Sequence, residues 1–141
     1  MKRFLGISIG AAAVFASGYW LGNVQAVRAD ADRVFELRTY TTNPGKLEDL
    51  KTRFRDHTIR IFNKHGMTSI GYWVPMDEPE SANTLVYMLA HKDRESARVA
   101  WQAFRADPEW VKVSTDSDKN GRIVQKVVSV FLSPTDFSQI K

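Results

Sequence analysis

Beyond position 33, hydrophobic residues repeat with two different periods that follow one another in a fixed order. Four segments are rich in β-branched and aromatic residues, and this composition with a period of two is typical of strands. Between them, two segments carry apolar residues three or four positions apart, which is typical of one face of a helix. The order is strand, helix, strand, strand, helix, strand. Because every element has to bury its apolar face against another, this order leaves few folds open to the chain.

The bounds of these elements follow from their patterns and from the residues that interrupt them. The strands are predicted at residues 34–41, 67–76, 84–90 and 122–132, and the helices at 46–65 and 94–106, with a short helix from Pro108. Pro44 and Gly45 break the first strand before the first helix, and Gly66 ends that helix. Asp93 is expected to cap the second helix, and Asp107 the short one.

The element order is that of the ferredoxin-like split motif, an α+β fold in which an antiparallel sheet carries both helices on one face. The other face of such a sheet is ordinarily polar. Here the strand at 84–90 is apolar on both faces, since Leu85, Tyr87 and Leu89 alternate with Val86, Met88 and Ala90. We therefore expect a second copy of the chain to cover the free face, so that a homodimer forms a dimeric α/β barrel. The alternative is a half-buried sheet with a modest ligand groove.

Residues 1–26 have the pattern of a signal peptide or of an N-terminal membrane anchor. Lys2 and Arg3 precede the uncharged segment 4–24, and Ala26 offers a signal-peptidase site. The alternative is an uncleaved anchor, because a run of about 20 uncharged residues can span a bilayer. In both cases we expect the folded part to be exported, periplasmic or secreted, and the membrane to be contacted only through the leader.

Charge and composition exclude several classes of partner and cofactor. Lys2 and Arg3 account for two of the 20 basic residues, which leaves 18 against 16 acidic ones, with the two signs interspersed. No one-sided positive field is built, so we expect no nucleic-acid partner. The chain has no cysteine, which excludes disulfides and thiolate metal sites. Zinc, P-loop and dinucleotide motifs are absent from the sequence, so we predict no metal and no cofactor.

Four segments, in order along the chain, resemble the motifs of NIPSNAP-type domains. They are Glu36–Tyr40 with Pro44–Lys46, His65–Gly66 with Gly71–Trp73, Ala106–Trp110, and Leu132–Ser138. The resemblance covers residues 34–138, and we place the domain at 33–138. It implies a dimeric α/β barrel built from two ferredoxin-like halves. It implies no particular reaction, because the family as a whole lacks an established activity, while proteins of similar fold include cofactor-free monooxygenases and haem-handling proteins.

The first strand and the first helix carry the candidate catalytic residues. His57 lies three residues after Phe54, on or beside the apolar stripe, where an imidazole could act as a base. The alternative is a histidine at the edge of the core, bonded to a backbone group. Glu36, Arg38 and Tyr40 share one face of the first strand and could supply an acid, a base and a phenol to the barrel. The alternative is an exposed edge strand with an ion pair.

The remaining aromatic and histidine candidates are weaker. Trp73 and Tyr87 stand on neighbouring strands and could line an apolar pocket, or they could be ordinary core residues. His65 is expected to cap the end of the first helix, where its charge would favour the helix dipole. His91 ends the third strand, and we expect it to be exposed.

Two functions remain open from the sequence. The first is a binding module that holds a small apolar ligand or a partner outside the cytoplasm, with Glu36, Trp73 and Tyr87 as ligand contacts. The alternative is a cofactor-independent monooxygenase-like enzyme acting on a small aromatic or carbonyl substrate. In that enzyme His57 would be the base, and Arg38 or Tyr40 would stabilise an oxyanion.

Overall fold

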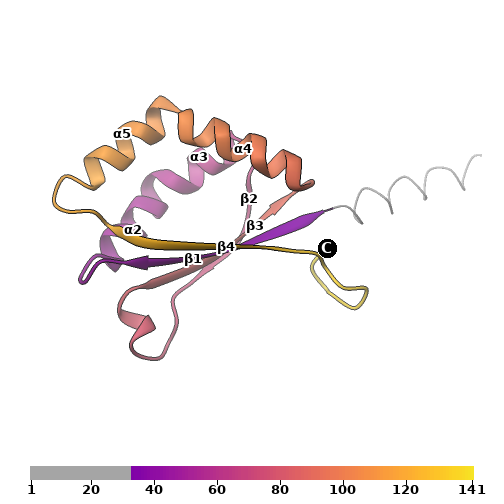
Figure 1. Cartoon of the computed structure of the whole chain (residues 1–141), viewed down its shortest axis with the longest axis horizontal. Helices are drawn as coiled ribbons and strands as arrows, with labels where there is room; N and C mark the ends of the chain where they lie inside the picture. The colour runs from indigo at the N-terminus through magenta and orange to yellow at the C-terminus, as the bar shows by residue number, and fades with distance from the viewer. Residues whose placement is uncertain (1–32) are drawn as a thin grey trace, which may run out of the picture.

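A computed structural model describes residues 33–141, and the predictions for the leader at 1–26 lie outside the described residues. Four antiparallel strands form one sheet in the order β2-β3-β1-β4. The strands are β1 (Val34–Thr42), β2 (Thr68–Trp73), β3 (Thr84–His91) and β4 (Val124–Leu132). All the long helices lie on one side of this sheet (Figure 1). The predicted α+β, ferredoxin-like fold class is confirmed.

Strand β1 lies inside the sheet, between β3 and β4. Leu37 pairs with Met88 of β3 on one side and with Val130 of β4 on the other. An exposed edge strand, the alternative left open for Glu36 and Arg38, is therefore wrong. Both side chains instead sit in the middle of the sheet, on the face that the helices cover.

The first helical segment contains one widened turn. It consists of α2 (Leu47–Arg53), the π-helical turn η1 (Phe54–Thr58) and α3 (Ile59–Lys64). The hydroxyl of Thr58 donates to the carbonyl oxygen of Arg53 at 3.1 Å, across the five-residue spacing of the π turn. Gly66 follows with a φ of 71°, a left-handed conformation that glycine adopts at no steric cost.

Two capping aspartates set the second helical segment. Asp93 accepts from the Ser96 backbone N–H at 2.6 Å and begins α4 (Arg94–Ala106). Asp107 accepts from the Glu109 backbone N–H at 2.8 Å and begins α5 (Pro108–Ser117). The other oxygen of Asp107 lies 2.7 Å from Nε2 of His65, which is the residue after α3. Asp107 therefore fastens the start of α5 to the end of α3.

The core fills the space between the sheet and the helices. Its aromatic residues, Phe54, Phe62, Tyr87, Trp101 and Phe104, meet largely edge to face, with ring centroids 4.9 to 6.0 Å apart. The apolar stripe predicted for the first helix is buried here. Within residues 33–141, no helix has the length and apolarity needed to cross a membrane.

The opposite face of the sheet is apolar and largely uncovered. Val128, Val130 and Leu132 of β4 pair with alternate residues of β1, so they point away from the helices. They are 43, 47 and 37% exposed, and Trp73 of β2 on the same face is 51% exposed. The chain after β4 folds back beside one end of this face, where Phe35 is buried (Figure 1).

Candidate functional site

A buried carboxylate, Glu36 of β1, organises the polar part of the interior. Its side chain is 1% exposed and receives four hydrogen bonds or close polar contacts. Oε1 accepts from Nη1 of Arg38 at 2.6 Å and from the hydroxyl of Ser129 at 2.7 Å. Oε2 accepts from the indole N–H of Trp101 at 2.6 Å and lies 3.1 Å from Nε2 of His91. One carboxylate thus joins β1, β3, β4 and α4.

These contacts hold Glu36 in its charged form. Burial alone would raise the pKa of Glu36, but the hydrogen bonds from His91, Ser129, Trp101 and Arg38 outweigh burial and lower this pKa from 4.5 to about 2. A carboxylate with so low a pKa stays deprotonated near neutral pH. Glu36 therefore acts as a fixed negative charge that positions its neighbours.

Arg38 lies next to Glu36 on β1 and extends between two aromatic rings. Its guanidinium carbon is 4.2 Å from the centroid of Trp101 and 5.5 Å from that of Tyr40. Nη2 donates to the hydroxyl of Tyr40 at 3.4 Å. Its buried Nε has no hydrogen-bond partner among residues 33–141. Burial disfavours the charged form, but Tyr87, Tyr40 and Glu36 more than offset it and raise the pKa of Arg38.

Tyr87 of β3 also belongs to this buried cluster. The residue is fully buried, and its ring lies 5.3 Å from the ring of Tyr40. Its hydroxyl is close to Tyr40 and Arg38 but makes no hydrogen bond of good geometry within the described part of the chain. Burial is the main reason why the pKa of Tyr87 is raised well above 10. The phenol therefore remains protonated and offers an O–H group to the interior.

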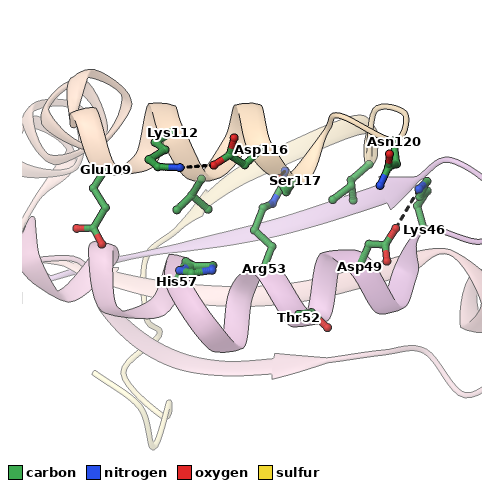
Figure 2. A pocket seen from close by; sticks show the side chains of 12 residues that line it. Lys46, Asp49, Thr52, Arg53, His57, Glu109, Lys112, Asp116, Ser117 and Asn120 are labelled. Carbon is green, nitrogen blue, oxygen red and sulfur yellow. Dashed lines mark hydrogen bonds and ion pairs between the residues drawn. The ribbon is translucent and has the colours of Figure 1, made fainter.

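A groove of about 640 Å³ runs between α2 and α5 (Figure 2). Arg53 of α2 lines it although its side chain is only 6% exposed. Its Nη1 donates to the hydroxyl of Ser117 at 3.2 Å and to Oδ1 of Asp118 at 3.4 Å. Arg53 is also within electrostatic range of Tyr40 and Tyr87. None of the residues of the Glu36 cluster lines the groove itself.

The family of the chain follows from its sequence and agrees with this fold. The sequence model of the NIPSNAP family matches residues 35–139. The chain belongs to the NIPSNAP family. Among curated proteins, none is similar enough to count as a relative. The predicted family resemblance is confirmed.

Solved structures show the same fold at low sequence identity. A NIPSNAP-like domain protein from Burkholderia xenovorans is 21% identical, with a TM-score of 0.67 over 77% of this chain and 90% of that one. A NIPSNAP family protein from Agrobacterium tumefaciens is 21% identical, with a TM-score of 0.68 over 77% of this chain and 99% of that one. SnoaB, a cofactor-independent oxygenase from Streptomyces nogalater, is 14% identical, with a TM-score of 0.53 over 77% of this chain and 99% of SnoaB. At these identities the similarity concerns the fold alone.

The NIPSNAP domain brings four of the six predicted site residues together, because the ring of Tyr87 on β3 lies 5.3 Å from that of Tyr40 on β1. Glu36, Arg38 and Tyr40 share the face of β1 that the helices cover, and hydrogen bonds link them in sequence. His57 lies outside this cluster. It is exposed on η1 and lines the groove between α2 and α5. Its position beside the apolar stripe does not carry it into the buried cluster.

Trp73 and Tyr87 lie on opposite faces of the NIPSNAP sheet. Tyr72, not Trp73, pairs with Tyr87, and the two tyrosine rings stack at 5.6 Å. Trp73 points to the uncovered face and is half exposed. The prediction that Trp73 and Tyr87 line one apolar pocket is therefore wrong.

Two important residues of the NIPSNAP domain were missed or misplaced by the sequence analysis. His91 is 4% exposed and contacts Glu36, so the prediction that it is exposed is wrong. The alternation Leu85, Tyr87, Leu89 continues to His91 and could have placed it on the buried face. Arg53 follows Leu50 by three residues and therefore lies on the buried side of the helix. Across residues 33–141, no group of three histidine or acidic side chains is placed to hold a metal ion.

Proposed function

We propose that this NIPSNAP protein is a homodimeric binding protein that acts outside the cytoplasm and holds a small molecule in each subunit. The observation that carries the proposal is the uncovered sheet face with Trp73, Val128, Val130 and Leu132. Monomeric proteins rarely leave a contiguous apolar surface of this kind in water. A second copy that presents the same face would bury both surfaces at once, as a two-fold interface requires.

The small-molecule role is supported by the groove between α2 and α5. Its volume of about 640 Å³ is in the range of ordinary ligand sites. It combines apolar wall residues, Val113 and Ile123, with the charged side chain of Arg53. Such a mixture binds the body of a ligand by burial and fixes its orientation by a few polar contacts.

The enzyme alternative has less support from the geometry. It needs a base beside a group that stabilises an oxyanion. His57 lines the groove between α2 and α5, whereas Arg38 and Tyr40 belong to the buried cluster and do not line that groove. The similarity to a cofactor-independent oxygenase extends to the fold, and a fold hosts many functions. Binding without turnover is therefore the function that we propose.

The proposed location depends on the leader. Lys2, Arg3 and the uncharged segment 4–24 support export, with cleavage after Ala26 or retention as a membrane tether. The folded part would then be periplasmic or secreted, and only an uncleaved leader would contact the membrane.

Native mass spectrometry of the protein purified from a full-length gene tests the proposal. The expected result is a dimer whose mass exceeds two polypeptides by a reproducible small molecule. The same spectrum reports whether the leader is cleaved. A dimer without any bound compound would overturn the small-molecule role, and a monomer at micromolar concentration would overturn the homodimer. Turnover of the bound compound would favour the enzyme alternative.

A further inference from the structure

We infer that the groove between α2 and α5 binds the carboxylate of a small organic acid, and that Arg53 holds this carboxylate. The inference names the ligand class for the small-molecule role proposed above and rests on that role. It does not depend on whether the protein is a dimer. Four observations carry it: the burial of Arg53, its unused hydrogen-bond donors, the pairing of the other charges, and the apolar lining of the groove.

Arg53 is a buried cation with incomplete hydrogen bonding. Its side chain is 6% exposed, yet it lines the groove and rises from α2 toward Ser117 (Figure 2). Both of its protein contacts, to Ser117 and Asp118, use the same nitrogen, Nη1. In the region from 33 to 141, Nε is buried without a partner and Nη2 makes no hydrogen bond. Nε is enclosed, so Nη2 is the unused donor of Arg53 that a ligand in the groove would meet, and a guanidinium N–H of this kind binds a carboxylate oxygen well.

The charge of Arg53 is only partly balanced by the protein. Asp118 is its sole acidic contact in the described chain, at 3.4 Å, and the same oxygen also accepts from the backbone N–H of Ile123 at 3.1 Å. Burial of this guanidinium in a poorly compensated site lowers the pKa of Arg53. Leaving a buried charge without full compensation is unfavourable, and an anionic ligand would remove that cost.

The other charged residues of the groove are already paired with each other. Nζ of Lys46 lies 3.0 Å from Asp49, and Nζ of Lys112 lies 2.5 Å from Asp116. Glu109 at one end is paired with Arg60 of α3. Arg53 has the longest ion pair of these cations, at 3.4 Å against 3.0 and 2.5 Å, so its charge is the least compensated, which favours a monoanion such as a carboxylate.

The surroundings of Arg53 also suit a small organic acid with an apolar body. Val113 and Ile123 line the groove beside it, and its guanidinium lies 5.5 Å from the ring centroid of Trp110. A carboxylate at Arg53 would therefore meet the guanidinium at one end and apolar walls along the groove.

The test uses benzoate as the probe and benzamide as its neutral counterpart of the same shape. Protein purified from the full-length gene and labelled with ¹⁵N-arginine is titrated at constant ionic strength, and the Nε–H resonance of Arg53 is followed by NMR. We expect benzoate to shift this resonance saturably and benzamide to leave it in place. Arg53→Lys keeps the charge but loses the Nη2 donor and the longer reach of the guanidinium, so benzoate affinity should fall about tenfold. The matched control Arg98→Lys, on the exposed side of α4, should bind benzoate as the wild type does.

Several outcomes would overturn the inference. They are equal shifts with benzoate and benzamide, unchanged benzoate affinity in a folded Arg53→Lys variant, and no saturable shift up to about 10 mM, well above a Kd of about 1 mM. Equal competition by inorganic phosphate would show a general anion site and not a carboxylate site. A neutral compound that copurifies while Arg53 stays unresponsive would refute the carboxylate and leave the proposed binding function intact. If nothing copurifies and benzoate does not bind, both proposals fail.

Discussion

His91 at the end of β3 lies 3.1 Å from Glu36 of β1, and the two side chains are almost completely buried. The contact closes a set of four around the Glu36 carboxylate, in which each oxygen serves two neighbours. A carboxylate with all its acceptor sites occupied can remain charged in the interior. The positions of Arg38 and Trp101 therefore depend on the charge of Glu36.

Replacing Glu36 by glutamine should destabilise the fold strongly. Glutamine has nearly the same volume, but its amide group can no longer accept at both ends, and Arg38 becomes a buried cation without its partner. Removing one member of a buried pair typically costs about 3–5 kcal/mol. We expect the free energy of unfolding of Glu36→Gln, from urea denaturation at fixed protein concentration, to fall by roughly this amount.

Glu48→Gln is the matched control for that measurement. Glu48 also forms an ion pair, with Lys51 at 2.7 Å, but its side chain is 76% exposed. Surface pairs contribute little, so the free energy of unfolding should change by less than about 1 kcal/mol. Equal effects of the two substitutions would show that the contacts of Glu36 do not stabilise the fold.

The same carboxylate should make stability depend on acid. The pKa of Glu36 is about 2 in the folded protein and 4.5 in its unperturbed state. The stabilisation is therefore complete above pH 4.5 and is lost as the pH falls toward 2, because the unfolded chain takes up the proton first. Between these pH values the wild type should lose about 3 kcal/mol more than Glu36→Gln. Urea denaturation of both proteins across this range measures the difference, and parallel curves would contradict the assigned charge.

The arrangement of elements could be predicted from the sequence because it rests on local periodicity. The helix expected at 94–106 has these bounds in the structure, and the strand expected at 34–41 ends one residue later. The π turn at Phe54–Thr58, where the Thr58 hydroxyl donates to the Arg53 carbonyl, was not predicted, because the apolar spacing does not change across it. A pattern of buried positions does not distinguish an α turn from a π turn.

The candidate site could be predicted only in part, because its contacts join residues far apart in the sequence. Alternation placed Glu36, Arg38 and Tyr40 on one face, and they do lie together. Apart from Arg38, the partners of Glu36 are 55 to 93 residues away, on β3, α4 and β4. Nothing in a single sequence indicates that Ser129 or Trp101 points at Glu36. Both contacts depend on how the whole chain folds.

The buried hydroxyl of Tyr87 should contribute nothing to stability. It has no hydrogen-bond partner of good geometry between residues 33 and 141, so the free energy lost by removing the hydroxyl from water is not offset by a hydrogen bond. Tyr87→Phe should leave the free energy of unfolding unchanged or raise it by up to about 1 kcal/mol. Tyr72→Phe is the control, since its hydroxyl lies 2.6 Å from that of Ser69, and its loss should cost about 1 kcal/mol. A clear destabilisation by Tyr87→Phe in chemical denaturation would reveal a hidden partner.

A single charge on the uncovered sheet face should separate the proposed dimer. Val130 of β4 points away from the helices and is 47% exposed in one subunit. In a two-fold dimer every substitution occurs twice, so Val130→Lys would bury two ammonium groups in an apolar interface. We expect the wild type to sediment as a dimer and Val130→Lys as a folded monomer at the same micromolar concentration.

Val111→Lys is the control for this prediction, because Val111 is 50% exposed on α5, on the helical side of the molecule. It adds the same charge at nearly the same exposure, so it should leave the dimer intact. Two results of the sedimentation experiment would contradict the sheet-to-sheet dimer. One is a dimer that survives Val130→Lys, and the other is equal dissociation by both substitutions, which would indicate a general effect of charge.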